Sequence, residues 1–524
     1  MIKGNMPMKK SLSILLATLL VLFSFSTLVA AEDVYPIVIK NAPLGHTYEA
    51  YQIFVGTLFE KYDEDENYVE TILANIDFGT GISAEGKAAL LSKYSTENDV
   101  DDIVATLTDE AAAAAFAKEI APYLDAADAT TNVCDTANNN SYTLSITKPG
   151  YYLVRDAEGT VEGENTASTA FLMKITRLNE PTVLNLKQYT TPTPDKDVAL
   201  PSEDATDLGS YTWDESVNTT IGQDVTFHLE GNFPGNTVGN DGTVYNFDKY
   251  DSFEFIFHDT LSAGLTIKPE TIRIFANDNY DSTYTVDVDY TVTVTANADG
   301  TTSLDITFAD LTELTYPSSD TEALTALHVT YDATLNKNAI AFSEDNTNRL
   351  YLEYSNSPDE DSTGLSEEIE VKVYTYGLVI YKVDTASTPL GGAKFVILRD
   401  GAEGKEFLNV TEEGNFFTTD STLATVFTSD ATDGTITVDG LAEGTYYVRE
   451  VQAPFGYNKI DGDTMLLIDK TVNAGLGTAT VTNDRGFLLP ETGGVGTMMF
   501  YTIGATMLLA SVIVAFSKRR SLQK

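Results

Sequence analysis

The sequence has almost no cysteine, with Cys134 alone among 524 residues. One cysteine cannot form an internal disulfide, so an exported chain of this kind must stabilise its domains in another way. Tryptophan is equally scarce, and Trp213 is its single example. We interpret Cys134 as a small apolar filler or loop residue, with a free-thiol role as the alternative.

Positive charge is also scarce. Lys and Arg together number 32 against 78 Asp and Glu, which gives a formal net charge of −46. Such a surface repels nucleic acid and anionic lipid, so neither is predicted as a partner. Acidity that keeps an exposed protein soluble is the simpler interpretation.

Residues that commonly carry catalysis or bind metals are few. The four histidines, at positions 46, 228, 258 and 328, show no metal-ligand spacing and are interpreted as structural. The acidic stretch 63–67 resembles the start of a calcium loop, but Tyr68 and Ala74 replace the required Gly and Glu. We therefore predict no metal, no cofactor and no enzyme acting on an external substrate.

The two ends of the chain carry export signals. Residues 1–31 combine a basic start, an apolar stretch and the small-residue site Val29-Ala30-Ala31, which predicts a secretory signal peptide, with a retained membrane helix as the alternative. Residues 495–517 contain no charge and precede the basic Lys518, Arg519 and Arg520. This pattern predicts a membrane span with a cytoplasmic tail, so the rest of the chain would lie outside the cell.

The body of the chain is predicted to be mainly β. Residues 284–294 alternate apolar and polar, reach the turn 297–300 and resume at 303–308, which predicts a hairpin. Comparable strand-like runs lie at residues 225–229, 253–257, 350–354, 368–373, 377–383, 394–398, 434–438 and 446–451. Their spacing favours tandem β-sandwiches of the immunoglobulin-like type. One short helix is expected, over residues 108–120, with Thr108 as its cap.

Composition divides the chain into five segments. The stiff Pro-rich joint at 190–194 and the polar loop at 357–364 separate the β-rich regions. We predict a signal peptide at 1–31, sandwich domains at 32–190, 191–375 and 376–486, and a C-terminal signal at 487–524.

The C-terminal signal resembles the sorting signal of Gram-positive surface proteins. Its pentapeptide is Leu489-Pro490-Glu491-Thr492-Gly493, followed by the apolar run and the basic tail. The resemblance implies that a membrane-bound cysteine transpeptidase, a sortase, cuts between Thr492 and Gly493. An ordinary membrane anchor is the alternative.

The resemblance extends along most of the chain. The stretches 45–54, 148–154, 257–265 and 354–358 resemble the successive domains of SpaA-type major pilins. In that family a lysine at the end of the first domain accepts the acyl group of the neighbouring subunit. The equivalent stretch here contains Lys187, although the Tyr-Pro pair that usually precedes this lysine is missing, and Lys196 is the nearby competitor.

The third domain resembles Cna-B-type sandwiches that carry an E-box. The stretch 446–457, with Glu450, Ala453-Pro454 and Gly456-Tyr457, has the E-box spacing, and Val451 stands where Thr is common. The resemblance implies a self-formed amide between Lys382 and Asn483, catalysed by Glu450. Burial would keep the amine neutral and the carboxyl protonated, as this chemistry requires. A buried Lys382–Glu450 salt bridge is the alternative.

The second domain offers a similar set. Lys196 opens its first strand, Asn356 lies in the apparent closing strand, and Asp259 is the candidate proton-handling carboxyl, with Glu254 as the alternative. No comparable trio is legible in the first domain.

The resemblance therefore implies a structural protein, the shaft subunit of a sortase-assembled pilus linked from Thr492 to Lys187 and anchored to the cell wall. Its expected partners are pilin-polymerising and housekeeping sortases, copies of itself, minor pilins, peptidoglycan and a host surface ligand. The alternative is a wall-anchored adhesin that is not polymerised, or a minor pilin at the tip or base. A secreted hydrolase would need a catalytic constellation that the sequence does not show.

Overall fold

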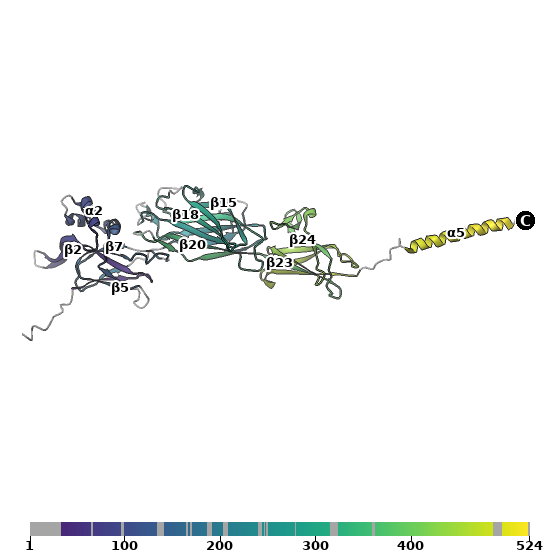
Figure 1. Cartoon of the computed structure of the whole chain (residues 1–524), viewed down its shortest axis with the longest axis horizontal. Helices are drawn as coiled ribbons and strands as arrows, with labels where there is room; N and C mark the ends of the chain where they lie inside the picture. Colours follow the sequence, from purple (N-terminus) through teal and green to yellow (C-terminus); the bar gives the residue numbers. More distant parts are fainter. Residues whose placement is uncertain are drawn as a thin grey trace, which may run out of the picture.

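The computed structural model describes most of the chain from residue 33 onward. The described residues are 33–63, 67–95, 99–133, 141–163, 166–167, 170–185, 191–202, 208–238, 244–245, 247, 250–277, 279–314, 323–358, 362–485 and 495–521. The predicted signal peptide, Cys134, Lys187 and the pentapeptide 489–493 lie outside these residues. Figure 1 shows three β-rich units following one another along the chain, with a helix at the C-terminal end.

The first unit has two sheets and a helical cover. Its strands are β1 (Tyr35–Lys40), β2 (Tyr48–Tyr62), β3 (Tyr68–Phe78), β4 (Ala129–Thr130), β5 (Ser141–Ile146), β6 (Gly150–Asp156), β7 (Ala170–Ile175) and β8 (Thr182–Asn185). One sheet has the order β5-β1-β8, and the other has the order β3-β2-β6-β7, with β4 beside β2. The first strand, β1, pairs with the last, β8, in parallel.

The helices of this unit outnumber the one that the sequence predicted. They are α2 (Ala84–Tyr94), α3 (Val100–Val104), α4 (Glu110–Ile120) and the short 3₁₀ turn η1 (Ala121–Tyr123). The cap of α4 is Asp109, whose side chain accepts a hydrogen bond from Ala112 N at 2.8 Å, rather than the predicted Thr108. Apolar side chains of α3 and α4 pack against β2, including Ile103, Phe116 and Ile120.

The second unit is a sandwich of two large sheets. Its elements are β9 (Thr193–Ala199), η3 (Leu208–Ser210), β10 (Ser216–Asn218), β11 (Asp224–Asn232), β12 (Thr237–Val238), β13 (Val244–Tyr245), β14 (Phe255–Leu261), β15 (Leu265–Ala276), β16 (Asn279–Thr283), β17 (Thr291–Ala296), β18 (Thr302–Phe308), β19 (Ala326–Leu335), β20 (Thr347–Ser355), β21 (Thr363–Leu365) and β22 (Ile369–Tyr374). One sheet has the order β16-β15-β19-β11-β9, and the other β10-β22-β20-β14-β18-β17. The predicted hairpin is present as β17 and β18, but its first strand begins at Thr291 rather than Tyr284.

The third unit is a smaller sandwich. Its elements are β23 (Tyr376–Asp384), β24 (Lys394–Gly401), β25 (Gly404–Val410), β26 (Asn415–Thr418), η4 (Ser421–Leu423), β27 (Phe427–Thr428), β28 (Thr435–Leu441), β29 (Gly444–Gln452), β30 (Asp463–Ile468), η5 (Asn473–Gly475) and β31 (Leu476–Asn483). One sheet has the order β28-β23-β31, and the other β26-β25-β24-β29-β30. The first strand, β23, pairs with the last, β31, in parallel.

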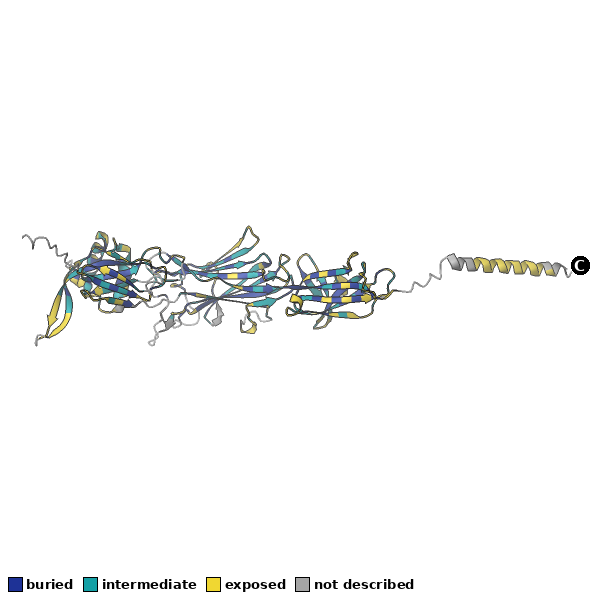
Figure 2. Cartoon of the chain, turned by 90° about the horizontal axis from the view of Figure 1, so that it is seen from below, coloured by how far each residue is buried: buried dark blue, intermediate teal, exposed yellow. Residues whose placement is uncertain are grey.

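Alternation of apolar residues explains why these segments form sandwiches. Successive side chains of a strand point to opposite faces, so every second residue enters the core. In β23, Leu378 and Ile380 point inward, whereas Tyr381 is exposed. Figure 2 shows this pattern as buried residues inside each unit and exposed ones along its surface. Tandem β-sandwiches, the predicted fold class, are confirmed.

The second and third units are hydrogen-bonded to each other. Asn218 donates to a Glu443 carboxylate oxygen at 2.9 Å and accepts from Glu443 N at 2.9 Å. Ile221 N donates to Gly440 O at 3.1 Å, and Asn415 N donates to Ile221 O at 2.8 Å. A single residue connects β22 to β23. The junction between the two units is therefore held both by this short connection and by the hydrogen bonds.

The C-terminal helix α5 (Val495–Ser521) covers the segment for which a membrane span was predicted. Its described side chains between residues 501 and 516 are all exposed (Figure 2). Among the described residues, no helix reaches the length and apolarity needed to cross a membrane. The predicted span is therefore not confirmed.

Candidate functional site

The predicted trio of the third unit comes together inside its sandwich. Lys382 on β23, Asn483 on β31 and Glu450 on β29 all occupy inward positions of their strands. Their exposed fractions are 0%, 0% and 2%. Lys382 and Asn483 come from neighbouring strands of one sheet, and Glu450 faces them from the other sheet.

In this trio the Glu450 carboxyl group is hydrogen-bonded to the Asn483 side-chain amide. Asn483 Nδ2 donates to Glu450 Oε1 at 2.9 Å and to Oε2 at 3.2 Å, and Ile460 N donates to Oε2 at 2.8 Å. Asn483 Oδ1 is buried and accepts no hydrogen bond. Rotating the amide by half a turn would present this oxygen to the carboxyl, where a protonated Glu450 could donate to it.

The amine of Lys382 is held by backbone rather than by a carboxylate. Its Nζ donates to Val481 O at 2.9 Å and to Val383 O at 3.1 Å. Burial lowers the pKa of Lys382, and the negative charges of Glu450 and Asp384 oppose this only in part. Among the ion pairs of the described residues, none joins Lys382 to Glu450, so the salt-bridge alternative is not what the structure shows.

The second unit brings the predicted Lys196 and Asp259 together, with Tyr331 and Asn348 beside them. Lys196 on β9 donates to Asp259 on β14, and both side chains are fully buried. The other carboxylate oxygen of Asp259 accepts from the hydroxyl of Tyr331 on β19. Asn348 Nδ2 on β20 donates to that hydroxyl at 2.6 Å, and Asn348 Oδ1 is buried without a hydrogen bond.

Burial governs the protonation of this cluster. Desolvation lowers the pKa of Lys196, although Asp259 opposes the shift. The pKa of the Tyr331 hydroxyl is raised well above its usual value, chiefly by burial and then by the neighbouring Asp259. The tyrosine therefore stays protonated and remains a donor to the carboxylate.

The structure does not bring the predicted Asn356 to Lys196. Leu350 pairs with Asp259 across β20 and β14, so Asn356 lies six residues further along, about 20 Å away at ~3.4 Å per residue. Asn356 instead donates to Val161 O of the first unit and accepts from Ser362 Oγ at 2.7 Å. Glu254, the alternative to Asp259, precedes β14 and is partly exposed between the buried Phe253 and Phe255.

Sequence reasoning missed Asn348, although a signal for it exists. Within β20 the inward positions are Asn348, Leu350, Leu352 and Tyr354. An amide that shares the inward face with three apolar side chains is a buried polar group that must be hydrogen-bonded or reactive. Asn356 was the predicted amide because it lies in the stretch 354–358, which resembles the pilins.

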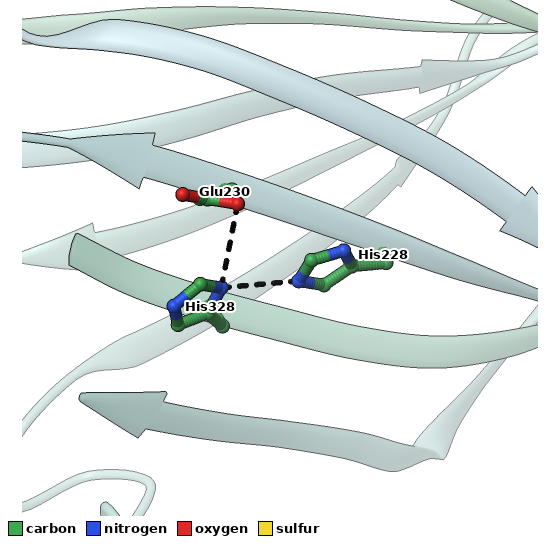
Figure 3. A group of neighbouring side chains, drawn as sticks. All are labelled: His228, Glu230 and His328. Atoms are coloured by element: carbon green, nitrogen blue, oxygen red, sulfur yellow. Dashed lines mark hydrogen bonds and ion pairs between the residues drawn. The ribbon is translucent and has the colours of Figure 1, made fainter. Parts of the chain in front are cut away.

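Each of the four histidines has a side-chain partner in the folded chain, and two of them lie together. His46 contacts Asp156 at 2.5 Å, and His258 lies between Asp305 at 2.7 Å and Glu353 at 2.9 Å. His228 and His328 lie together, with His228 Nε2 and His328 Nδ1 3.1 Å apart, and Glu230 beside them (Figure 3). Burial, with the neighbouring His228, lowers the pKa of His328 to about 4. The sequence interpretation missed this group because it depends on strand register.

Comparison with known proteins places two of the units. Residues 377–484 match the family model of the SpaA prealbumin-like fold domain. Residues 241–358 match that of the Gram-positive pilin backbone subunit 2, a Cna-B-like domain. No curated protein sequence matches the chain. The third unit thus matches a SpaA-type domain, and the second unit matches a Cna-B-like domain of backbone pilins.

Solved structures agree on the fold. The T6 backbone pilin of serotype M6 Streptococcus pyogenes, described as a modular three-domain structure, is 17% identical, with 84% of this chain and 80% of that one covered and a TM-score of 0.51. The major pilin SpaD from Corynebacterium diphtheriae is 16% identical, with 86% and 98% covered and a TM-score of 0.48. The chain therefore contains two domains of pilin families and shares its fold with the T6 backbone pilin.

Proposed function

We propose that this backbone-pilin chain is the shaft subunit of a cell-surface pilus that a sortase assembles covalently. The fold and the two family matches support a structural role, and the sequence supplies the linkage: Thr492 of the sorting pentapeptide would be joined to Lys187 of the next subunit. The same reaction on a wall precursor would attach the finished polymer to peptidoglycan. Minor pilins and a host surface ligand are the further partners that this assignment implies.

The buried trio of the third unit is the observation that carries the proposal furthest. A neutral Lys382 amine attacks Asn483 Cγ, forming the new C–N bond, and the bond from Cγ to Nδ2 breaks. The departing nitrogen leaves as ammonia after taking one proton that the lysine amine has released. Glu450, hydrogen-bonded to Asn483 Nδ2 at 2.9 Å, is placed to relay that proton and ends the reaction unchanged.

The second unit supports the same reaction with other residues. Here Lys196 supplies the amine, Asp259 handles the proton, and Asn348 replaces Asn356 as the amide that is attacked. Tyr331 connects Asp259 to Asn348 by two hydrogen bonds, which holds the amide beside the carboxylate. Ammonia is again the leaving group, so the second and third units would lose one each.

Intact mass tests the internal bonds on the purified chain. We expect the wild type to be lighter than its sequence by two ammonia molecules. Glu450→Ala and Asp259→Ala should each restore one, and Asn348→Ala should restore the same one as Asp259→Ala. Asn356→Ala is the matched control and should leave both losses in place. A wild-type mass equal to that of the sequence would refute both bonds.

Polymerisation is tested separately, in wall extracts boiled in detergent and probed for this protein. A high-mass ladder that collapses to monomer in Lys187→Ala, but persists in the exposed first-unit control Lys148→Ala, would support the shaft assignment. The full burial of the Lys196 side chain supports Lys187 over Lys196 as the acceptor of the intersubunit link. A single band in every strain would instead favour a wall-anchored adhesin.

A further inference from the structure

His228, Glu230 and His328 form a compact group on the outer face of one sheet of the second unit. Strands β11 and β19 are antiparallel neighbours, and their register sets Glu230 opposite His328. Leu229 and Val329, the adjacent residues, point into the core. The three polar side chains therefore lie together on the face that turns away from the core.

The nitrogen and oxygen atoms of the group converge. Figure 3 shows the two imidazoles and the carboxylate turned toward one another, with His228 Nε2 at 3.1 Å and Glu230 Oε2 at 3.7 Å from His328 Nδ1. One atom from each residue lies within 4.8 Å of the other two. Tetrahedral zinc sites with bonds of ~2.0–2.1 Å have ligand atoms ~3.3 Å apart, so small side-chain movements would close the set.

The group is sheltered from water although it lies outside the core. The exposed fractions of the His228, His328 and Glu230 side chains are 10%, 5% and 22%. The Trp213 ring covers His228 at a centroid distance of 5.2 Å. A metal ion at this place would be shielded from solvent on most sides. Water could reach it only beside the partly exposed carboxylate of Glu230.

We propose that His228 Nε2, His328 Nδ1 and a carboxylate oxygen of Glu230 bind one divalent transition-metal ion of the zinc class. Two imidazoles and a carboxylate suit zinc and its neighbours, and leave a fourth position for water. The hard ions Ca²⁺ and Mg²⁺ prefer sets made of oxygen alone, so they fit poorly. The ion replaces the present contact between the two imidazoles.

A second carboxylate supports the tautomer that this binding needs. For Nε2 of His228 to offer a lone pair, its proton must be on Nδ1. Asp197 Oδ2 lies 3.8 Å from that nitrogen, which is beyond hydrogen-bond distance, so the side chain must move closer to accept that proton. A carboxylate on the far side of a ligating imidazole is the usual arrangement around protein-bound zinc. Asp197 is the neighbour of Lys196 on β9, so the site and the internal amine lie on opposite faces of one strand.

Calorimetric titration of Zn²⁺ into the chelator-treated, purified full-length chain tests the proposal. We expect the wild type to bind one Zn²⁺ per chain with saturation. The double variant His228→Ala/His328→Ala should lack this binding, so the heat that remains in its titration measures weak binding by the acidic surface. Glu230→Gln keeps the side-chain volume and should weaken the affinity at least ten-fold. The control His258→Gln removes a histidine that also lies between two carboxylates, and should leave the affinity unchanged.

Two further measurements keep the result decisive if a variant is unstable. Each variant is first melted without metal, and Glu230→Gln, the most exposed position, should melt within a few degrees of the wild type. Added Zn²⁺ should then raise the melting temperature of the wild type and of His258→Gln equally, that of Glu230→Gln less, and that of His228→Ala/His328→Ala not at all. Zinc affinity that is equal in all variants, absent from the wild type, or abolished by equimolar Ca²⁺ would overturn the proposal and leave a hydrogen-bonded histidine pair.

Discussion

Removing Glu450 should separate the effect of the proposed cross-link from that of ordinary packing. In Glu450→Ala the Lys382 amine and the Asn483 amide remain in place, but the carboxyl that contacts the amide is lost. Without proton relay the amide bond should not form. The variant then carries the same third unit as the wild type, folded but not closed by a bond.

The expected loss of stability follows from the length of the closed loop. A link between Lys382 and Asn483 encloses about 100 residues, and constraining a loop of that size in the unfolded chain is worth ~5 kcal/mol. For a domain of 60–100 residues, ~1 kcal/mol moves the melting temperature by ~4–8 °C. The third unit should therefore melt roughly 20–40 °C lower in Glu450→Ala.

Scanning calorimetry of the full chain, paired with intact mass on the same sample, checks this. One transition should fall while those of the other units stay within a few degrees. Glu412→Ala, which removes an exposed carboxylate of the same unit, is the matched control and should change neither transition nor mass. A Glu450→Ala sample that still lacks the ammonia, or that melts with the wild type, would refute the reasoning.

Three further outcomes are expected. In Glu450→Ala the free Lys382 amine has a lowered pKa, so the folded chain binds fewer protons than the unfolded one. The free energy of unfolding should therefore rise with pH toward ~10.4 and level off above it. Chemical denaturation of this variant and of Glu450→Ala/Lys382→Met measures the effect, and a difference between the two that does not change with pH would contradict it. Gly414→Ala places a Cβ 2.5 Å from Gly222 Cα, so amide hydrogen exchange at Ile221 and Asn415 should accelerate as the second and third units separate, and unchanged exchange would count against a tight junction. Asn356→Ala should lower the free energy of unfolding by ~1–3 kcal/mol because Val161 O loses its hydrogen-bond donor. The melting temperature should fall while the number of ammonia molecules lost stays the same. If the variant instead retained one more ammonia than the wild type, Asn356 would be the cross-linked amide.

Alternation of apolar residues was enough to predict most strands. The runs at 225–229, 350–354, 377–383 and 446–451 all lie within strands of the structure. The same rule fails where polar turns imitate alternation, as at residues 284–290, where Asp287 N donates to Tyr290 O in a turn. Two helices were missed: α3 has only five residues, and both α2 and α3 place buried side chains such as Leu90 and Ile103 in the core beneath the sheet, so that packing contributes to their stability.

The candidate site residues also divide into those that the sequence could predict and those that depend on the folded structure. Lys382, Glu450 and Asn483 could be named in advance because each occupies a recognisable place in the E-box resemblance. The partner of Lys196 could not, because the choice between Asn348 and Asn356 depends on the register of β14 against β20. The histidine group depends on register as well, since Glu230 and His328 are distant in sequence and opposite only in the sheet.

The parallel pairing of β23 with β31 has a mechanical consequence. In a parallel pair the chain enters along the first strand at one end and leaves along the last strand at the other, so tension on the third unit runs along its length. A bond from Lys382 to Asn483 would pass that tension directly between the two strands and leave residues 383–482 unloaded. With the intersubunit link at Lys187, at the end of the first unit, tension would pass through the second and third units of each subunit. The first unit would then bear no tension. The first unit is then the part of the fibre that can change its surface without weakening it.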